Sequence, residues 1–274
     1  MCRTRLRSRA DTPWACLIPH LMTQLKNKEI IKRALKSPTV SKAYDTHGVL
    51  YGDYLDVRYY KNVKITFNGT DTSKTRRKDG NKRNDSVARS KVFIYRLVTS
   101  NIRKHGRNFR PIFGTYTFEK SITDLDIALT HYRRYIRRLN NYTGKKIRYV
   151  AVPQIQWQRY KKTKQKVWHF HFVFFNLPKI DFDTNDKLWG QGYVNMQFIK
   201  KISDIGAYIA GYMTKKDFKE IPFNRRFYYC STKLKRPKDF FHKSSIEKLL
   251  KNDKVKEVSE YKGASYKQIK YKLC

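Results

Sequence analysis

KVWHFHFVFFNLP, residues 166–178, is a strongly apolar stretch that places two histidines inside what its composition predicts to be a buried β-strand. Side chains alternate between the two faces of a strand, so His169 and His171 share one face while Phe170 and Phe172 lie on the other. A buried imidazole is costly unless it forms a hydrogen bond or binds a metal. The stretch therefore predicts either two histidines satisfied by carbonyl groups or a pair that converges on one ion.

A third ligand is expected on the strand before it. Residues 146–157 and 166–176 flank a polar turn, and this spacing predicts an antiparallel hairpin. Gln154 and Gln156 are both polar where the pattern favours apolar residues, and either amide oxygen could complete a metal site. Imidazole suits zinc or manganese whereas magnesium prefers oxygen, so the residues leave the metal open.

The surrounding pattern predicts an α+β fold. Strands that pair locally, with two long helices left to cover one face, indicate an α+β sandwich. A doubly wound parallel sheet would need a helix after each strand, and the hairpin breaks that order. Ser203 is a possible N-cap for the last helix. The expected elements are helices over 86–104, 124–141 and 202–217, and strands over 110–120, 146–157, 166–176 and 193–199.

The chain is expected to divide into three parts. Alternation over 42–67 predicts short strands or a hairpin, and a second hairpin is expected around Lys262 and Gly263 near the end of the chain. Met22 begins an ordinary polar helical stretch, which makes it an alternative start of the protein. The predicted parts are a basic N-terminal segment (1–85) with a flexible linker (68–86), a central domain (86–217) and a basic C-terminal extension (218–274).

The charge balance predicts a polyanionic partner. Lys and Arg number 61 against 22 Asp and Glu, which gives a formal net charge of +39. Such an excess favours nucleic acid over a membrane surface, because the basic residues run along the whole chain and no apolar run is long enough to span a bilayer. The cysteines are scattered, which fits a reducing cytoplasm better than a disulfide framework or zinc module. They are Cys2, Cys16, Cys230 and Cys274.

A second group of polar residues lies in AYIAGYMTKK, residues 207–216. On one continuous helix, Tyr208, Tyr212 and Lys215 would fall on a single stripe. Such tyrosines are often half-buried core residues with solvated hydroxyls. A tyrosine can also act as a nucleophile if its negative charge is stabilised, which Lys215 could do. Together with a metal that polarises a phosphodiester, these residues predict DNA strand transfer through a phosphotyrosine.

Three motifs in order resemble those of the HUH endonucleases, and within them the rolling-circle replication initiators of plasmids and single-stranded DNA phages, of the ORF2 type. The motifs are FGTYTF (113–118), the segment 149–178 with its histidine strand, and YIAGYMTKK (208–216). The resemblance runs from about Ser86 to Lys216. It implies an antiparallel RRM-like (ferredoxin-like) sheet with helices packed on one face, and Mg or Mn held by the two histidines and Gln154.

Two positions depart from the family pattern. Gln154 stands where the family has a glutamate ligand, and Gly211 stands where it has a lysine between the tyrosines. The alignment of the motifs favours Tyr208 as the nucleophile, whereas the surviving lysine spacing favours Tyr212. Both tyrosines could act in turn.

The resemblance implies that the protein nicks single-stranded DNA at a replication origin in the cytoplasm of a bacterial host. Tyrosine attack would leave a 5′-phosphotyrosine and a 3′-OH primer, and the reverse attack would religate the strand. The chain has no GxxxxGK[ST] motif, so a host helicase would serve beside the host polymerase. The alternatives are an HUH transposase or relaxase, a noncatalytic DNA-binding protein with a decayed site, and a basic RNA-binding or ribosome-associated protein with core histidines.

Overall fold

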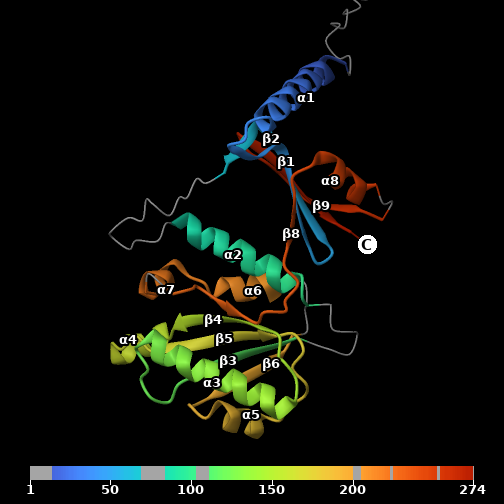
Figure 1. The fold of residues 1–274 in the computed structure, drawn as a ribbon. Helices are drawn as coiled ribbons and strands as arrows, with labels where there is room; N and C mark the ends of the chain where they lie inside the picture. The colour runs from blue at the N-terminus through green and yellow to red at the C-terminus, as the bar shows by residue number, and fades with distance from the viewer. Residues whose placement is uncertain are drawn as a thin grey trace, which may run out of the picture. The chain divides into compact units, whose positions relative to one another are not determined.

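The structure is a computed structural model that describes residues 14–68, 84–102, 111–199, 205–222, 225–251 and 254–273. The chain forms two compact units, one of residues 1–75 with 239–274 and the other of residues 76–238. Each contains a five-stranded antiparallel sheet, so the predicted α+β class is confirmed (Figure 1). The described helices are α1 (Trp14–Leu35), α2 (Asn84–Thr99), α3 (Leu125–Thr143), α4 (Trp157–Thr163), α5 (Phe182–Trp189), α6 (Ile205–Gly211), α7 (Lys215–Glu220) and α8 (Lys243–Leu250). The described strands are β1 (Val40–Tyr51), β2 (Tyr54–Phe67), β3 (Ile112–Thr117), β4 (Tyr149–Ile155), β5 (Trp168–Phe174), β6 (Val194–Phe198), β7 (Tyr229–Cys230), β8 (Lys238–Phe240), β9 (Lys256–Lys262) and β10 (Tyr266–Lys272).

The histidine strand lies at the centre of the sheet in residues 76–238. Its strand order is β6-β3-β5-β4-β7, and β5 is antiparallel to both of its neighbours. The predicted hairpin of β4 and β5 is confirmed. Its register places Gln154 opposite His169 and Val152 opposite His171, while Thr115 of β3 pairs with His171 from the other side.

Helices cover both faces of this sheet, not one as predicted. Phe170 and Phe172 pack on the face that α3 and α5 cover, whereas Val150, Val173 and Phe113 pack with α2, α6 and α7 on the other. The reason is in β4 and β5 themselves, whose apolar side chains are buried on both faces. A strand that is apolar on both sides needs a layer on each.

Local signals explain where α3 begins and ends. The Asp124 side chain accepts hydrogen bonds from two backbone N–H groups of the first turn, which satisfies donors that have no partner inside the helix. Gly144 follows the helix in the left-handed conformation, at φ 62°, where glycine is favoured because it lacks a Cβ. The helix therefore starts one residue after the expected position, and its buried stripe covers the sheet.

Three helical features were not predicted. α4 occupies the expected polar turn, and α5 lies in a segment with no predicted element. The helix expected over 202–217 is two helices, α6 and α7, because the Thr214 side chain accepts a hydrogen bond from Asp217 N and caps a new helix. The possible N-cap Ser203 lies outside the described residues.

The other unit is built from both ends of the chain. Its strand order is β8-β1-β2-β10-β9, so the predicted hairpins β1-β2 and β9-β10 are joined through pairing of β2 with β10. Its core is small, with Leu55, Val57 and Ile246 of α8 at the centre. Among the residues described, no helix is both long and apolar enough to cross a membrane.

Candidate active site

The three predicted metal ligands lie together on one face of the sheet. The side-chain oxygen of Gln154, Oε1, is 2.8 Å from His171 Nε2 and 3.0 Å from His169 Nε2. The two imidazole rings have their centroids 4.5 Å apart. Cross-strand register in a hairpin thus brings a single amide oxygen between two imidazoles that alternate on β5.

The orientation of the Gln154 amide follows from its other partners. Its nitrogen, Nε2, donates a hydrogen bond to the Tyr212 carbonyl oxygen at 3.1 Å and lies 3.4 Å from a carboxylate oxygen of Asp217. Both of these groups are acceptors, so the amide nitrogen must face them and the amide oxygen must face the histidines.

Both histidines are held in the neutral form. Burial lowers the pKa of His169 to about 4. Burial also holds the pKa of His171 well below its usual range, and the neighbouring His169 adds to the effect. Neutral imidazole is the form that binds metal ions, so the site is ready to bind a cation near pH 7 without first losing a proton.

Thr115 on β3 supports either tautomer of His171. Its hydroxyl oxygen is 3.1 Å from His171 Nδ1. When Nε2–H donates to Gln154, the threonine hydroxyl donates to Nδ1; when Nε2 is free to bind a cation, Nδ1–H donates to the hydroxyl oxygen. The hydroxyl can reverse its role without moving.

The donor atoms have a spacing that fits one divalent ion. Bonds of about 2.1 Å to a six-coordinate ion place neighbouring ligand atoms about 3 Å apart, close to the distances from Gln154 Oε1 to the two imidazole nitrogens. This set carries no charge, since it comprises two imidazoles and an amide. No cluster of three or more His, Cys, Asp or Glu residues in the described part of the chain offers an alternative site.

The two tyrosines adjoin the histidines and differ in exposure. The Tyr212 ring stacks on His171 with centroids 3.7 Å apart, and its hydroxyl donates to the Tyr208 hydroxyl at 2.6 Å. Burial and the bond to Tyr208 raise the pKa of Tyr212. The Tyr208 side chain is 48% exposed and packs edge-on against Phe113. Tyr208 is therefore the more accessible oxygen, and it already accepts one hydrogen bond.

Lys215 does not continue the tyrosine stripe, and the prediction that it would is wrong. The chain leaves the helical path after Gly211, so Lys215 is the first residue of α7. Its side chain is exposed, and within the described residues no hydrogen bond or ion pair joins it to either tyrosine. Glycine is unfavourable in a helix interior, and the cap at Thr214 competes for the following residues.

Asp217 is a further residue of the site, and the sequence pattern did not identify it. It is 1% exposed and accepts hydrogen bonds from the Trp157 indole at 2.8 Å and from Ile155 N at 3.2 Å, as well as from the Thr214 hydroxyl. These bonds fix the carboxylate that faces the Gln154 amide. The sequence TKKD (214–217) is a capping-box pattern that could have revealed both this residue and the start of α7.

Comparison with protein families agrees with this arrangement. Residues 111–217 match a family of replication-associated proteins of the ORF2 type, which is a family of rolling-circle replication proteins. The segment runs from the start of β3 to Asp217 and thus includes all the residues of the site. The predicted resemblance is confirmed over these residues. Comparisons with curated proteins and with solved structures return no match.

Proposed function

We propose that this protein initiates rolling-circle replication by nicking single-stranded DNA at an origin through a tyrosine. The observation that carries the proposal is the convergence of Gln154, His169 and His171 beside two tyrosines that share a hydrogen bond. This convergence lies within the segment that matches a replication-associated family.

In the proposed reaction, Tyr208 is the nucleophile. Its phenolic oxygen loses its proton and attacks the scissile phosphorus, the bond from phosphorus to the 3′ oxygen breaks, and the 3′ oxygen takes up a proton. The products are a 5′-phosphotyrosine and a 3′-OH that primes synthesis. The Tyr212 hydroxyl donates to the attacking oxygen and stabilises its developing charge. Religation is the reverse attack by the 3′-OH, and the bond energy kept in the tyrosine ester makes it possible.

Gln154, His169 and His171 would hold the divalent ion, Mg or Mn. When bound, this ion polarises the phosphodiester as a Lewis acid. Two imidazoles favour Mn over Mg, and an uncharged ligand set leaves the full positive charge to interact with the phosphate. The role of Asp217 is to position the amide of Gln154, since it touches neither the histidines nor the substrate phosphate in this scheme.

The basic surface would supply most of the DNA affinity. A net charge of +39 favours release of counterions from the phosphate backbone, so binding should weaken steeply as salt increases. In this scheme the host supplies the helicase and the polymerase.

The test is a cleavage assay on pooled single-stranded oligonucleotides with Mn, read as a covalent protein–DNA adduct on denaturing gels. The wild type should form the adduct, and His169→Ala/His171→Ala should not. His131→Ala removes a histidine from α3 on the other face of the sheet and should retain it. If no divalent metal yields an adduct while salt-sensitive binding persists, the protein is a DNA-binding protein without nicking activity.

The ligand assignment has its own test in the two glutamines. Gln154→Glu adds a negative charge to the ligand set and should lower the Mn concentration for half-maximal adduct formation by about tenfold or more, because ligand charge tunes metal affinity. Gln156→Glu is the matched control, since the described hydrogen bonds join Gln156 to neither histidine. Equal effects of the two substitutions would contradict Gln154 as the ligand.

A further inference from the structure

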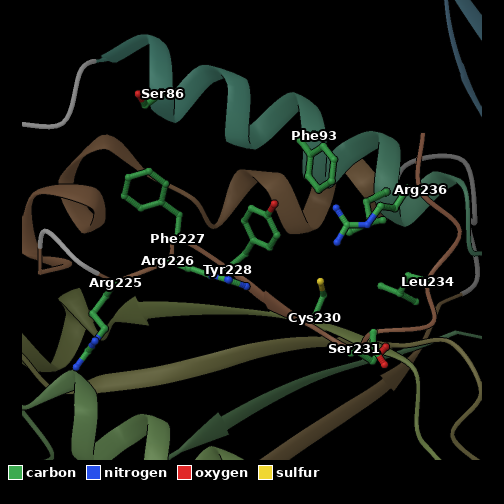
Figure 2. A pocket seen from close by; sticks show the side chains of 12 residues that line it. Ser86, Phe93, Arg225, Arg226, Phe227, Tyr228, Cys230, Ser231, Leu234 and Arg236 are labelled. Carbon is green, nitrogen blue, oxygen red and sulfur yellow. The ribbon is translucent and has the colours of Figure 1, made fainter. Parts of the chain in front are cut away.

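A second hollow in residues 76–238 lies apart from the histidines. Its volume is about 670 Å³, and it opens between α2 and the segment around β7 (Figure 2). Pockets that hold small organic ligands have volumes in this range. Its lining combines aromatic rings with arginines, and none of these residues belongs to the tyrosine and histidine site.

One wall of this pocket is aromatic. The rings of Phe93 on α2 and Tyr228 before β7 have centroids 5.8 Å apart and planes inclined by 28°. Both side chains are only half-buried, so part of each ring is open to a ligand. Exposed aromatic faces of this kind stack on unpaired bases with little regard to base identity.

The other wall carries positive charge that has no counterion in the described residues. Arg226 and Arg236 line the pocket and are exposed, and no described hydrogen bond or ion pair engages either guanidinium group. Arg225 differs, because it forms two hydrogen bonds with the carboxylate of Asp126. In Figure 2 the Arg236 side chain points toward the space between Phe93 and Cys230, whereas Arg225 points away toward α3.

Electrostatics places both free arginines around the same groups. Burial raises the pKa of Tyr228 and of Cys230, and the positive charges of Arg236 and Arg226 oppose that rise in each case. The pocket therefore holds an aromatic surface and two unpaired cations within one small volume. A base joined to a phosphate has the complementary chemistry.

The pocket shares a face of the sheet with the candidate active site. Cys230 pairs with Val150 of β4, and Gln154 lies four residues further along the same strand on the same side. Four residues of a strand span about 13 Å. That length corresponds to about four nucleotides of one strand at the spacing of stacked bases, about 3.4 Å each, and to fewer if the strand is extended.

We infer that this pocket binds one nucleotide, with the base against Phe93 and Tyr228 and the phosphate between Arg226 and Arg236. In a single-stranded DNA substrate, the bound nucleotide would lie within about four positions of the scissile phosphate, by the strand spacing above. This second statement rests on the proposed function, whereas binding of a nucleotide does not. The shared chemistry is a nucleoside phosphate, either free or within a strand.

The first experiment measures binding of fluorescent oligo(dT) and of dTMP to the full chain. Arg226→Gln/Arg236→Gln should weaken oligo(dT) binding about tenfold or more and lower the salt slope by about 0.7 for each phosphate that the variant no longer neutralises. The matched control is Arg134→Gln/Arg137→Gln, which removes equal charge from exposed positions on α3. If both double variants lose the same affinity, the pocket is not a binding site.

The second experiment uses Cys230 as a reporter inside the pocket. Saturating oligo(dT) should slow its alkylation by iodoacetamide at least fivefold, measured on the Cys230 peptide by mass spectrometry. An abasic oligonucleotide and inorganic phosphate should protect much less, because neither has a base to stack. Phe93→Leu/Tyr228→Leu keeps apolar volume and should lose the protection, which separates stacking from folding.

The two arms also distinguish the sources of the nucleotide and the fate of the function. Protection by dTMP indicates a site for a free nucleotide, and protection by oligo(dT) alone indicates a nucleotide within a strand; both support the inference. Unchanged alkylation under saturating oligo(dT) overturns it, even if the Mn-dependent adduct forms. Protection without any adduct supports the pocket and refutes the proposed nicking.

Discussion

Two pairs of tyrosines on opposite faces of the same sheet form nearly the same hydrogen bond. Under α3, the hydroxyls of Tyr132 and Tyr149 are 2.7 Å apart; on the other face, those of Tyr208 and Tyr212 are 2.6 Å apart. The environments differ. Tyr132 is 4% exposed and packs among phenylalanines, whereas Tyr208 is 48% exposed and its partner stacks on His171.

The contrast shows that the hydrogen bond between two phenols does not by itself make either reactive. Burial raises the pKa of both Tyr132 and Tyr149, so neither can become a phenolate near pH 7 and their bond serves only to satisfy two buried polar groups. The exposed pair has a bound partner for its charge, access for a substrate and a possible metal site beside it. Exposure and neighbours separate a structural pair from a candidate catalytic one.

The largest expected difference between the two pairs is in adduct formation. Tyr208→Phe should reduce the Mn-dependent adduct at least about 1,000-fold because it removes the attacking oxygen, whereas Tyr132→Phe should leave it nearly unchanged. Tyr212→Phe removes only a donor to the phenolate and should cost about ten- to a hundredfold. Mass spectrometry of the adduct peptide names the linked residue, and a link at Tyr212 in the wild type would reverse the assignment.

The second difference concerns stability in acid. An unfolded histidine has a pKa near 6.5, whereas that of folded His169 is about 4, so between these values the unfolded chain takes up a proton that the folded chain does not. The free energy of unfolding should therefore fall as pH falls, by about 3 kcal/mol for His169 alone, and His171 acts in the same direction. Urea unfolding in chelator at pH 7, 6 and 5, followed by tryptophan fluorescence, measures this. Parallel pH profiles of the wild type and His169→Gln would contradict it.

The third test separates Asp217 as a positioning residue from a purely structural one. Asp217→Asn replaces an acceptor by an amide whose nitrogen can face Gln154, so the Mn concentration for half-maximal adduct formation should rise about ten- to a hundredfold. Asp181→Asn is the matched control, since Asp181 also caps a helix with its carboxylate but lies far along the chain from the histidine pair. A loss of stability with no change in the metal requirement would assign Asp217 to folding alone.

The smallest expected effect is on the stability of the closed face. Tyr132→Phe leaves the Tyr149 hydroxyl without its buried partner and should lower the free energy of unfolding by about 1 kcal/mol. Tyr208→Phe leaves an exposed partner that water can satisfy and should change it by less than about 0.5 kcal/mol. Equal losses in urea unfolding would remove the distinction between the two pairs.

Much of the candidate site could be predicted because its contacts are local. His169 and His171 follow from the alternation of one strand, and Gln154 follows from the register of the hairpin that contains them. The break between α6 and α7 was missed because the helical spacing of the tyrosines outweighed the cap at Thr214. Asp217 was missed with it, since its role appears only when α7 packs against β4.

Pairing between distant strands could not be predicted from local pattern. β2 and β10 pair over seven positions, and Arg58 donates to the side chain of Gln268 across a separation of 210 residues. No turn fixes such a register, and each segment alone reads only as a hairpin. For the same reason, the sequence pattern indicated three successive parts, whereas the compact units interleave the ends of the chain.

The amide of Gln154 has mechanical consequences for the timing of the reaction. Its oxygen faces the histidines while its nitrogen holds the backbone of Tyr212, so one planar group spans the ion-binding side and the nucleophile side. The amide cannot rotate toward one without releasing the other. A strand that displaces the turn after α6 would loosen the grip on the ion, and by thermodynamic reciprocity an ion on the oxygen stiffens that turn. Loading and aiming are then a single event.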